Sequence, residues 1–230
     1  MEENSIKALE NPVFRKISAI VDKLGVEAYV VGGYVRDYYL HRPSTDIDVV
    51  VVGSGIEVAE ALGREVKGKV SVFKTFGTAM VRAGGTEVEF VGARKESYTY
   101  DSRKPIVEPG TLEDDQRRRD FTINAMAWCL NGERFGELVD PFEGMYDLED
   151  CIIRTPCDPD ITFSDDPLRM MRAIRFATQT LADKRGLDGG TDRLAIVIGH
   201  RVDDTRIGLA IELALDLLCL NVEADRKSVV

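Results

Sequence analysis

Histidine and cysteine are scarce in this sequence, and both shortages narrow the possible chemistry. The 230-residue chain has two histidines, His41 and His200, which lie far apart and so argue against a histidine-based zinc site. Its four cysteines show neither CxxC nor CxxH spacing. We therefore expect buried or incidental thiols of a protein in the reducing cytoplasm.

Long apolar runs are also missing. No stretch approaches the length of a membrane span, and the first residues, MEENSIKALE, lack the basic-then-apolar pattern of a secretion signal. The hydrophobic content of 44% and charged content of 30% are ordinary for a globular protein. The length suits one medium domain with a smaller attached piece.

Positive charge is in deficit, because 40 acidic residues outnumber 30 lysines and arginines and give a formal net charge of −10. A protein that holds nucleic acid normally presents a basic surface to the phosphates. Either this chain does not hold nucleic acid by itself, or the part that does so lies outside these residues.

Apolar spacing and turn residues in the first half predict helices alternating with short strands. Helices are predicted over residues 13–24, 34–40 and 56–66, and strands over residues 27–31, 47–52, 70–73, 78–82 and 86–91. Gly84 and Gly85 predict a hairpin turn between the last two strands.

The second half is predicted to be mainly helical. The predicted elements are a polar mobile loop over 94–109, a helix over 112–130 with a polar start and an apolar end, a turn and short helix over 140–150, a short strand at 152–153 and an amphipathic helix over 166–179. This order indicates an α+β head with a small mixed β-sheet flanked by helices, followed by a helical neck.

Asp46 and Asp48 stand at the start of the predicted strand IDVVVV. Side chains two residues apart on a strand point to the same face, so the two carboxylates converge. Such a pair raises both pKa values unless a cation lies between them, and Mg²⁺ prefers such oxygens. Two solvated turn residues are the alternative, which the DxD pattern alone favours.

The residues upstream favour the metal-binding interpretation of Asp46 and Asp48 over solvated turn residues. Gly32 and Gly33 separate a strand from a helix, where missing side chains let backbone N–H groups approach phosphate oxygens. Arg36 adds a cation on the first turn of that helix. A plain tight turn is the alternative for the glycines alone. Together with the paired carboxylates, the pattern predicts a metal-dependent nucleoside triphosphate site.

A third carboxylate is expected on a neighbouring strand. Glu87 and Glu89 share one face of the strand predicted over residues 86–91. Either could complete the metal site, and both could equally be exposed strand residues.

These residues carry a resemblance to the class II CCA-adding and bacterial poly(A) polymerase family. Its signature is similar to VGGYVRD at 31–37 followed by STDID at 44–48. Four more stretches resemble it in the right order: EFVGARKE at 89–96, RRRDFTINA at 117–125, DPFEG at 140–144 and DDPLRMMRAIRF at 165–176.

The resemblance spans roughly residues 13–179 and implies a domain organisation. It implies a polymerase β-like nucleotidyltransferase head over 1–155 and the start of a helical neck over 156–179. We expect residues 180–230, with a helix over 207–220, to be a helical or irregular tail of a truncated or frame-shifted product.

The resemblance also implies roles for the motif residues of the head. Asp46 and Asp48 would hold two Mg²⁺ ions, with Glu89 as the third acidic residue. The triphosphate would lie against Gly32, Gly33 and Arg36, and the ribose and phosphates against Arg119, Asp120 and Asn124. Asp120 suits a ribose 2′-hydroxyl and so favours NTP over dNTP. A solvated charge run is the alternative for residues 117–120.

In the neck, the resemblance implies that Asp166 and Arg169 recognise the Watson–Crick edge of the incoming base, with Arg172 and Arg175 on the same nucleotide-binding helix. An acceptor and a fork of donors can satisfy cytosine or adenine and mismatch guanine and uracil. The alternative for Asp166 and Arg169 is an acidic helix cap with an i, i+3 ion pair.

The activity implied is template-independent transfer of CMP and AMP from CTP and ATP to the 3′ end of tRNA, with the main RNA-holding region outside this chain. That arrangement would account for the negative net charge. Three alternatives are a poly(A) polymerase, an enzyme that adds only CC or only A, and a non-catalytic nucleotide-binding module. A metal-dependent phosphohydrolase would need histidine and aspartate clusters that the sequence lacks.

Overall fold

The computed structural model describes residues 7–99, 102–177 and 195–197 and is built on a seven-stranded mixed sheet. Its strands are β1 (Glu27–Val31), β2 (Ile47–Val52), β3 (Lys69–Phe73), β4 (Thr78–Ala83), β5 (Thr86–Gly92), β8 (Ala127–Cys129) and β9 (Leu138–Val139). Their order is β3-β4-β5-β2-β1-β8-β9, in which β2 and β5 run parallel and the other neighbours antiparallel. The predicted α+β head is confirmed.

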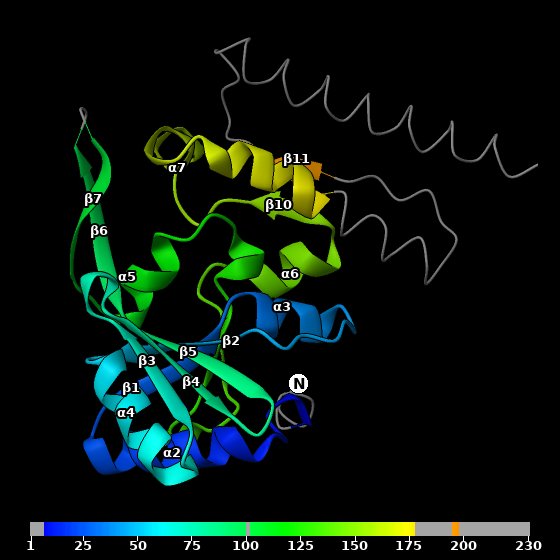
Figure 1. Ribbon diagram of the computed structural model, residues 1–230. Coiled ribbons are helices and arrows are strands. Elements are labelled where there is room, and N and C mark those ends of the chain that lie inside the picture. Colours follow the sequence, from blue (N-terminus) through cyan, green and yellow to red (C-terminus); the bar gives the residue numbers. More distant parts are fainter. Residues whose placement is uncertain (1–6, 100–101, 178–194, 198–230) are drawn as a thin grey trace, which may run out of the picture.

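Two helices, α2 (Pro12–Leu24) and α4 (Gly55–Val66), cover one face of this sheet (Figure 1). The side chain of Asn11 accepts a hydrogen bond from the amide of Val13, and Gly25 ends α2 at a φ of 67°, which a residue with a side chain rarely adopts. The apolar faces of both helices pack on the alternate strand residues that point toward them. Burying each such side chain stabilises the fold by about 1.5–3 kcal/mol. The fully buried members include Phe14, Ile17, Leu62, Val49, Val51 and Phe90.

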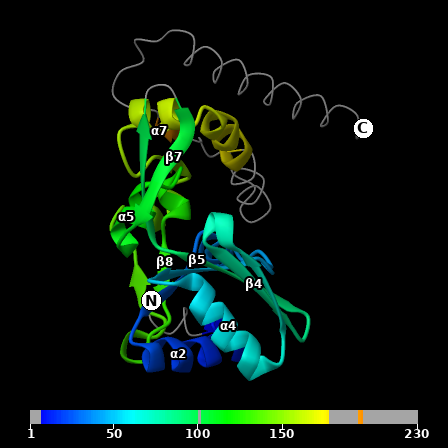
Figure 2. The ribbon, with the colours of Figure 1, turned by 60° about the vertical axis from the view of Figure 1, so that its left-hand side comes forward.

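The remaining short elements gather beyond the other side of the sheet, where Figure 2 shows α5 and α7 away from α2 and α4. They are α3 (Gly33–Tyr39), α5 (Leu112–Arg117), η2 (Thr122–Asn124), α6 (Gly144–Glu149), β10 (Ile152–Arg154), α7 (Pro159–Asp165) and a helix over 168–177. Two short turns lie elsewhere: η1 (Lys74–Phe76) connects β3 to β4, and η3 (Gly132–Arg134) contacts α2, where the amide of Gly132 donates to Asp22. The strand β11 (Ala195–Val197) pairs parallel with β10. The two carboxylate oxygens of Asp140 accept from the amides of Gly144 and Met145 at 2.8 and 2.9 Å, so the turn predicted there begins α6.

The loop predicted over residues 94–109 is wrong. The segment forms a two-stranded hairpin of β6 (Arg94–Thr99) and β7 (Ser102–Pro109). A hairpin that pairs only with itself has no sheet face to bury, so its sequence needs no apolar alternation. Ion pairs of Glu96 with Arg94 at 2.8 Å and with Arg118 at 3.4 Å hold its base instead.

The helix predicted over residues 112–130 is also wrong beyond Arg117. After α5 the chain passes through η2 and enters β8, whose residues Ala127, Trp128 and Cys129 are all buried. Because β8 lies between β1 and β9 with both faces covered, it shows a continuous apolar run and no period of two. Such a short run resembles a buried helix turn in sequence.

The helix predicted over residues 166–179 is confirmed with a later start, because α7 ends at Asp165 and the next helix is described over 168–177. On that helix Phe176 is buried, whereas Leu168 and Met171 are each 65% exposed. The predicted helix over 207–220 lies outside the described residues. Within the described part of the chain, no helix combines the length and apolar character that crossing a bilayer requires.

Candidate active site

The Gly32–Gly33 turn links the end of β1 to the start of α3 and brings the backbone close to two predicted site residues. Gly32 has φ 73° and ψ −130°, a conformation that is strained for any residue with a Cβ. A Cβ on Gly32 would lie 3.2 Å from Nη1 of Arg119 and 3.9 Å from the carbonyl oxygen of Asn124. Glycine therefore permits a close approach of the turn to the RRRDFTINA segment.

The predicted carboxylates meet where β2 and β5 run side by side. Asp46 directly precedes β2, and Asp48 pairs in register with Glu89 of the parallel strand β5. Enclosure by the surrounding protein raises the pKa of Asp48, which Arg119 lowers and Asp46 raises further. Partial burial, followed by the charge of Asp48, raises the pKa of Glu89. The two acidic side chains thus interact across the strands.

Glu87, the other candidate for the third carboxylate, has a different partner. Its Oε1 lies 2.8 Å from Nε of Arg82 on β4, and both side chains are about half exposed. Of the two candidates, Glu89 is the one whose pKa is raised by the charge of Asp48. Over the described ranges 7–99, 102–177 and 195–197, no three His, Cys, Asp or Glu side chains form a preassembled metal cage.

A chain of hydrogen bonds joins α3 to the helix over 168–177. Nη1 of buried Arg36 donates to Oδ1 of Asn124 at 2.5 Å, and Nδ2 of Asn124 donates to Oδ1 of Asp120 at 3.0 Å. Nε of Arg172 donates to Oδ2 of Asp120 at 2.6 Å. Nε and Nη2 of Arg36 both donate to Asp37, at 2.9 and 2.7 Å. These polar side chains are therefore held in fixed positions.

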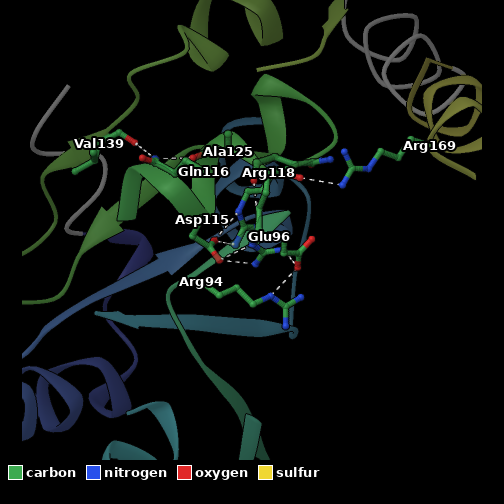
Figure 3. Close-up of polar contacts among 10 residues, drawn as sticks. Arg94, Glu96, Asp115, Gln116, Arg118, Ala125, Val139 and Arg169 are labelled. Atoms are coloured by element: carbon green, nitrogen blue, oxygen red, sulfur yellow. Dashed lines mark hydrogen bonds and ion pairs between the residues drawn. The ribbon is translucent and has the colours of Figure 1, made fainter. Parts of the chain in front are cut away.

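Arg119 is held by a residue that the sequence interpretation missed. Its Nε and Nη2 donate to Oδ2 of Asp115 at 3.2 and 2.8 Å, and its Nη1 donates to the carbonyl oxygen of Asn124 at 3.4 Å. Asp115 is fully buried in α5, where Figure 3 shows its carboxylate among arginine side chains. Its spacing of three and four residues from Arg118 and Arg119 is the signal that could have identified it.

An open cavity of about 490 Å³ lies between these elements. All the predicted site residues line this cavity except Glu89, Asp166 and Arg169. Three residues that were not predicted, Asp37, Ser44 and Phe176, line it as well. The lining residues are Gly32, Gly33, Arg36, Asp37, Ser44, Asp46, Asp48, Arg119, Asp120, Asn124, Arg172, Arg175 and Phe176. The ring of Phe176 lies 4.8 Å from the guanidinium carbons of both Arg36 and Arg175. Carboxylates and arginines that line one cavity suit a metal-bound polyphosphate.

The structure places the predicted base-recognition pair elsewhere. Oδ1 of Asp166 accepts from the amide of Leu168 at 3.1 Å and so caps the helix over 168–177. Nη2 of Arg169 donates to the carbonyl oxygen of Arg118 at 2.9 Å (Figure 3), and Nη1 donates to that of Thr162 at 3.4 Å. Arg169 lines a separate cavity of about 200 Å³ between α5, α7 and the base of the β6–β7 hairpin.

The sheet order, the paired carboxylates at the start of a strand and the arginine-lined cavity define a nucleotidyltransferase head of the polymerase β-like class. The chain belongs to the family of poly A polymerase head domains, because residues 28–154, more than half of its length, match that family's model.

Curated relatives are similar over much of this chain. It is 46% identical over 152 residues to an A-adding tRNA nucleotidyltransferase of Aquifex aeolicus, a match that covers 66% of the chain and 18% of the relative. It is 40% identical over 174 residues to a CCA-adding enzyme of Anoxybacillus flavithermus, covering 74% and 42% respectively. The chain thus spans less than half the length of each of these two relatives.

A solved structure is also similar, that of a tRNA nucleotidyltransferase complexed with a primer tRNA and an incoming ATP analogue. Its TM-score is 0.67 at 35% identity, over 87% of this chain and 50% of that one.

Proposed function

We propose that this chain is the catalytic part of an RNA nucleotidyltransferase that adds CMP and AMP from CTP and ATP to the 3′ end of tRNA. The observation that carries the proposal is the pairing of Asp48 with Glu89 beside a cavity lined by the Gly32–Gly33 turn and arginines. The named activities and partners of the similar proteins support it. We place the reaction in the cytoplasm, in keeping with the free thiols Cys129, Cys151 and Cys157 of the described part.

Asp46, Asp48 and Glu89 would hold Mg²⁺, and their donor set fits it, because carboxylate oxygens of interacting acidic groups are the ligands that this ion prefers. When bound, Mg²⁺ neutralises triphosphate charge and favours ionisation of the attacking 3′-hydroxyl. The carboxylates would orient the attacking 3′-hydroxyl.

The triphosphate would lie against the backbone of the Gly32–Gly33 turn and the guanidinium groups of Arg36 and Arg119. Both guanidinium groups are already oriented by hydrogen bonds: Asp37 and Asn124 hold that of Arg36, and Asp115 holds that of Arg119. Preorganised cations of this kind stabilise charge that moves to the leaving pyrophosphate.

The ribose would contact Asp120. Its Oδ1 already accepts two hydrogen bonds, from Phe121 and Asn124, whereas Oδ2 accepts one from Arg172. A carboxylate oxygen can accept two, so Oδ2 retains capacity for a ribose hydroxyl. A deoxyribose would leave that capacity unused, which favours NTP over dNTP.

Base recognition by Asp166 and Arg169 is part of the same proposal. It requires Arg169 to exchange the carbonyl oxygens of Arg118 and Thr162 for the base. Arg172 and Arg175 would remain at the cavity and contact the phosphates or sugar.

The test is transfer from labelled CTP and ATP onto tRNA lacking its CCA end, with Mg²⁺, together with a separate titration of nucleotide binding. We expect Glu89→Gln to abolish transfer and the matched variant Glu87→Gln to retain it. Unchanged transfer by Glu89→Gln, or by the double variant Asp46→Ala/Asp48→Ala, would refute the proposal. Binding by the wild type without transfer would assign RNA holding to residues outside this chain.

A second candidate is addition of A alone, favoured by the 46% identity to an A-adding relative. Product length on tRNA ending before CCA and on tRNA ending in CC distinguishes the two.

A further inference from the structure

Asp115 is a buried carboxylate that binds two consecutive arginines. Its Oδ1 accepts from Nε of Arg118 at 3.0 Å and from Nη2 of the same residue, and its Oδ2 accepts from Nε and Nη2 of Arg119. The carboxylate has no exposed surface, and Figure 3 shows it within this group. Each oxygen thus meets one guanidinium fork, an arrangement stronger and more directional than a neutral hydrogen bond.

The end of α5 makes this possible. Residues three and four positions after Asp115 lie on the same side of the helix as Asp115, so Arg118 and Arg119 can both approach its carboxylate. Here α5 ends at Arg117 and Arg118 is its C-cap residue, so the chain turns and brings both guanidinium groups to one carboxylate. Arg118 also reaches Glu96 at the base of β6, at 3.4 Å.

For Arg119 the consequence is a single orientation. With Nε and Nη2 bonded to Asp115, Nη1 lies toward the Asn124 carbonyl oxygen and the Gly32 backbone. Arg119 also lowers the pKa of Asp48, so its charge acts on the carboxylate side of the cavity. Arg119 lines the cavity, and Nη1 is the one nitrogen of its guanidinium group that Asp115 does not bind.

We propose that Asp115 is a positioning residue for nucleotide binding: it acts through Arg119 by fixing the guanidinium with its Nη1 edge toward the triphosphate position. The inference rests on the proposed nucleotide-binding function. It predicts that a neutral residue at position 115 loses nucleotide affinity only while an arginine stands at position 119.

A double-mutant cycle on the 230-residue chain tests this. Affinity for Mg·CTP and Mg·ATP is measured by calorimetric titration for the wild type, Asp115→Asn, Arg119→Ala and the double variant. We expect Asp115→Asn to weaken binding about tenfold in the wild-type background and less than about twofold in the Arg119→Ala background. Equal losses in both backgrounds would show a merely structural role and overturn the proposal.

Two further variants separate positioning from stability. Asp147 is also a buried aspartate paired with an arginine, Arg154 at 3.1 Å, but it does not line the cavity. Asp147→Asn should lower the thermal midpoint and leave nucleotide affinity within about twofold. Arg118→Gln removes the other half of the cluster and retains the bonds between Asp115 and Arg119, so it should also bind within about twofold.

The Arg118→Gln result keeps the proposal testable if Asp115→Asn does not fold. A tenfold loss on Arg118→Gln would mean that the cluster acts only as a structural unit, and would overturn the proposal. If the wild type binds neither Mg·CTP nor Mg·ATP, the proposed function fails, and this inference fails with it. If the wild type binds nucleotide but the affinity losses of Asp115→Asn and Arg119→Ala simply add in the double variant, the positioning role of Asp115 is wrong and the proposed function stands.

Discussion

Replacing Glu89 with glutamine should stabilise the metal-free protein while removing a carboxylate that we propose to be catalytic. Glu89 stands opposite Asp48 on adjacent parallel strands, and the charge of Asp48 is one cause of its raised pKa. Two like charges that face each other across strands oppose folding. Glutamine retains the shape of the side chain and removes this repulsion.

The magnitude is modest because Glu89 is exposed. Like charges directly opposite on a sheet cost about 0.2–1 kcal/mol, and solvent screening favours the lower half of that range. A gain of about 0.5 kcal/mol corresponds to a rise of about 1–2 °C in the thermal midpoint for a chain of this size.

The pH dependence follows from the direction of the pKa shift. A carboxyl group whose pKa is raised by folding favours the folded state below its unfolded pKa, and this contribution is lost as pH rises through its folded pKa. The ionised Glu89 therefore destabilises the protein at pH 7, where Glu89→Gln should show its full gain. Near pH 4 the wild-type side chain is protonated and the gain should vanish.

Thermal unfolding in EDTA at pH 7 and at pH 4 measures this effect, with Glu87→Gln as the matched control. Glu87 faces Arg82 at 2.8 Å, so its replacement should give no gain. Addition of Mg²⁺ should stabilise the wild type more than Glu89→Gln. A thermal midpoint of Glu89→Gln equal to or below that of the wild type in EDTA at pH 7 would refute the reasoning.

Three further predictions concern backbone packing, the cavity wall and pH. Gly144→Ala should destabilise the fold by about 1–3 kcal/mol in denaturant titration, because its Cβ would lie 2.3 Å from the carbonyl oxygen of Thr122; an unchanged midpoint would contradict this close approach. Arg172→Ala removes the 2.6 Å bond to Asp120 and should weaken Mg·ATP binding about tenfold while costing less than about 1 kcal/mol of stability, since Arg172 is partly exposed. Enclosure, partly offset by Arg119, raises the pKa of Asp48 in the metal-free protein, so Mg²⁺ affinity measured by titration should fall on acidification at a pH above the ordinary aspartate value of about 3.9; Mg²⁺ affinity that stays constant down to that pH would contradict a raised pKa.

The parts of the fold that could be predicted have strong local signals. The strand over residues 47–52 has a β-branched run, and the helix over residues 12–24 has an apolar face between a capping asparagine and a glycine. The Gly32–Gly33 turn was identifiable because few other residues adopt its backbone conformation.

The remaining parts depend on contacts distant in the sequence. Nothing local distinguishes Ala127–Cys129 as a strand, because its character comes from pairing with β1 and β9. The predicted cavity residues came from four separate stretches, whereas Asp115 has no ligand-facing role and acts only on other side chains. The sequence predicted the segment around Asp115 only as the polar start of a helix, which gives no sign of its burial.

The helix over residues 168–177 lies outside residues 28–154, the stretch that the family model matches, yet Arg172, Arg175 and Phe176 line the cavity. Phe176 also packs edge-on against Phe121, with ring centroids 5.8 Å apart. The module by which the family is defined and the unit that forms the site therefore have different boundaries. A chimera joined at residue 154 would combine Asp46, Asp48, Arg36 and Arg119 of one parent with Arg172, Arg175 and Phe176 of the other. Exchange of a complete site between relatives requires a junction beyond residue 177.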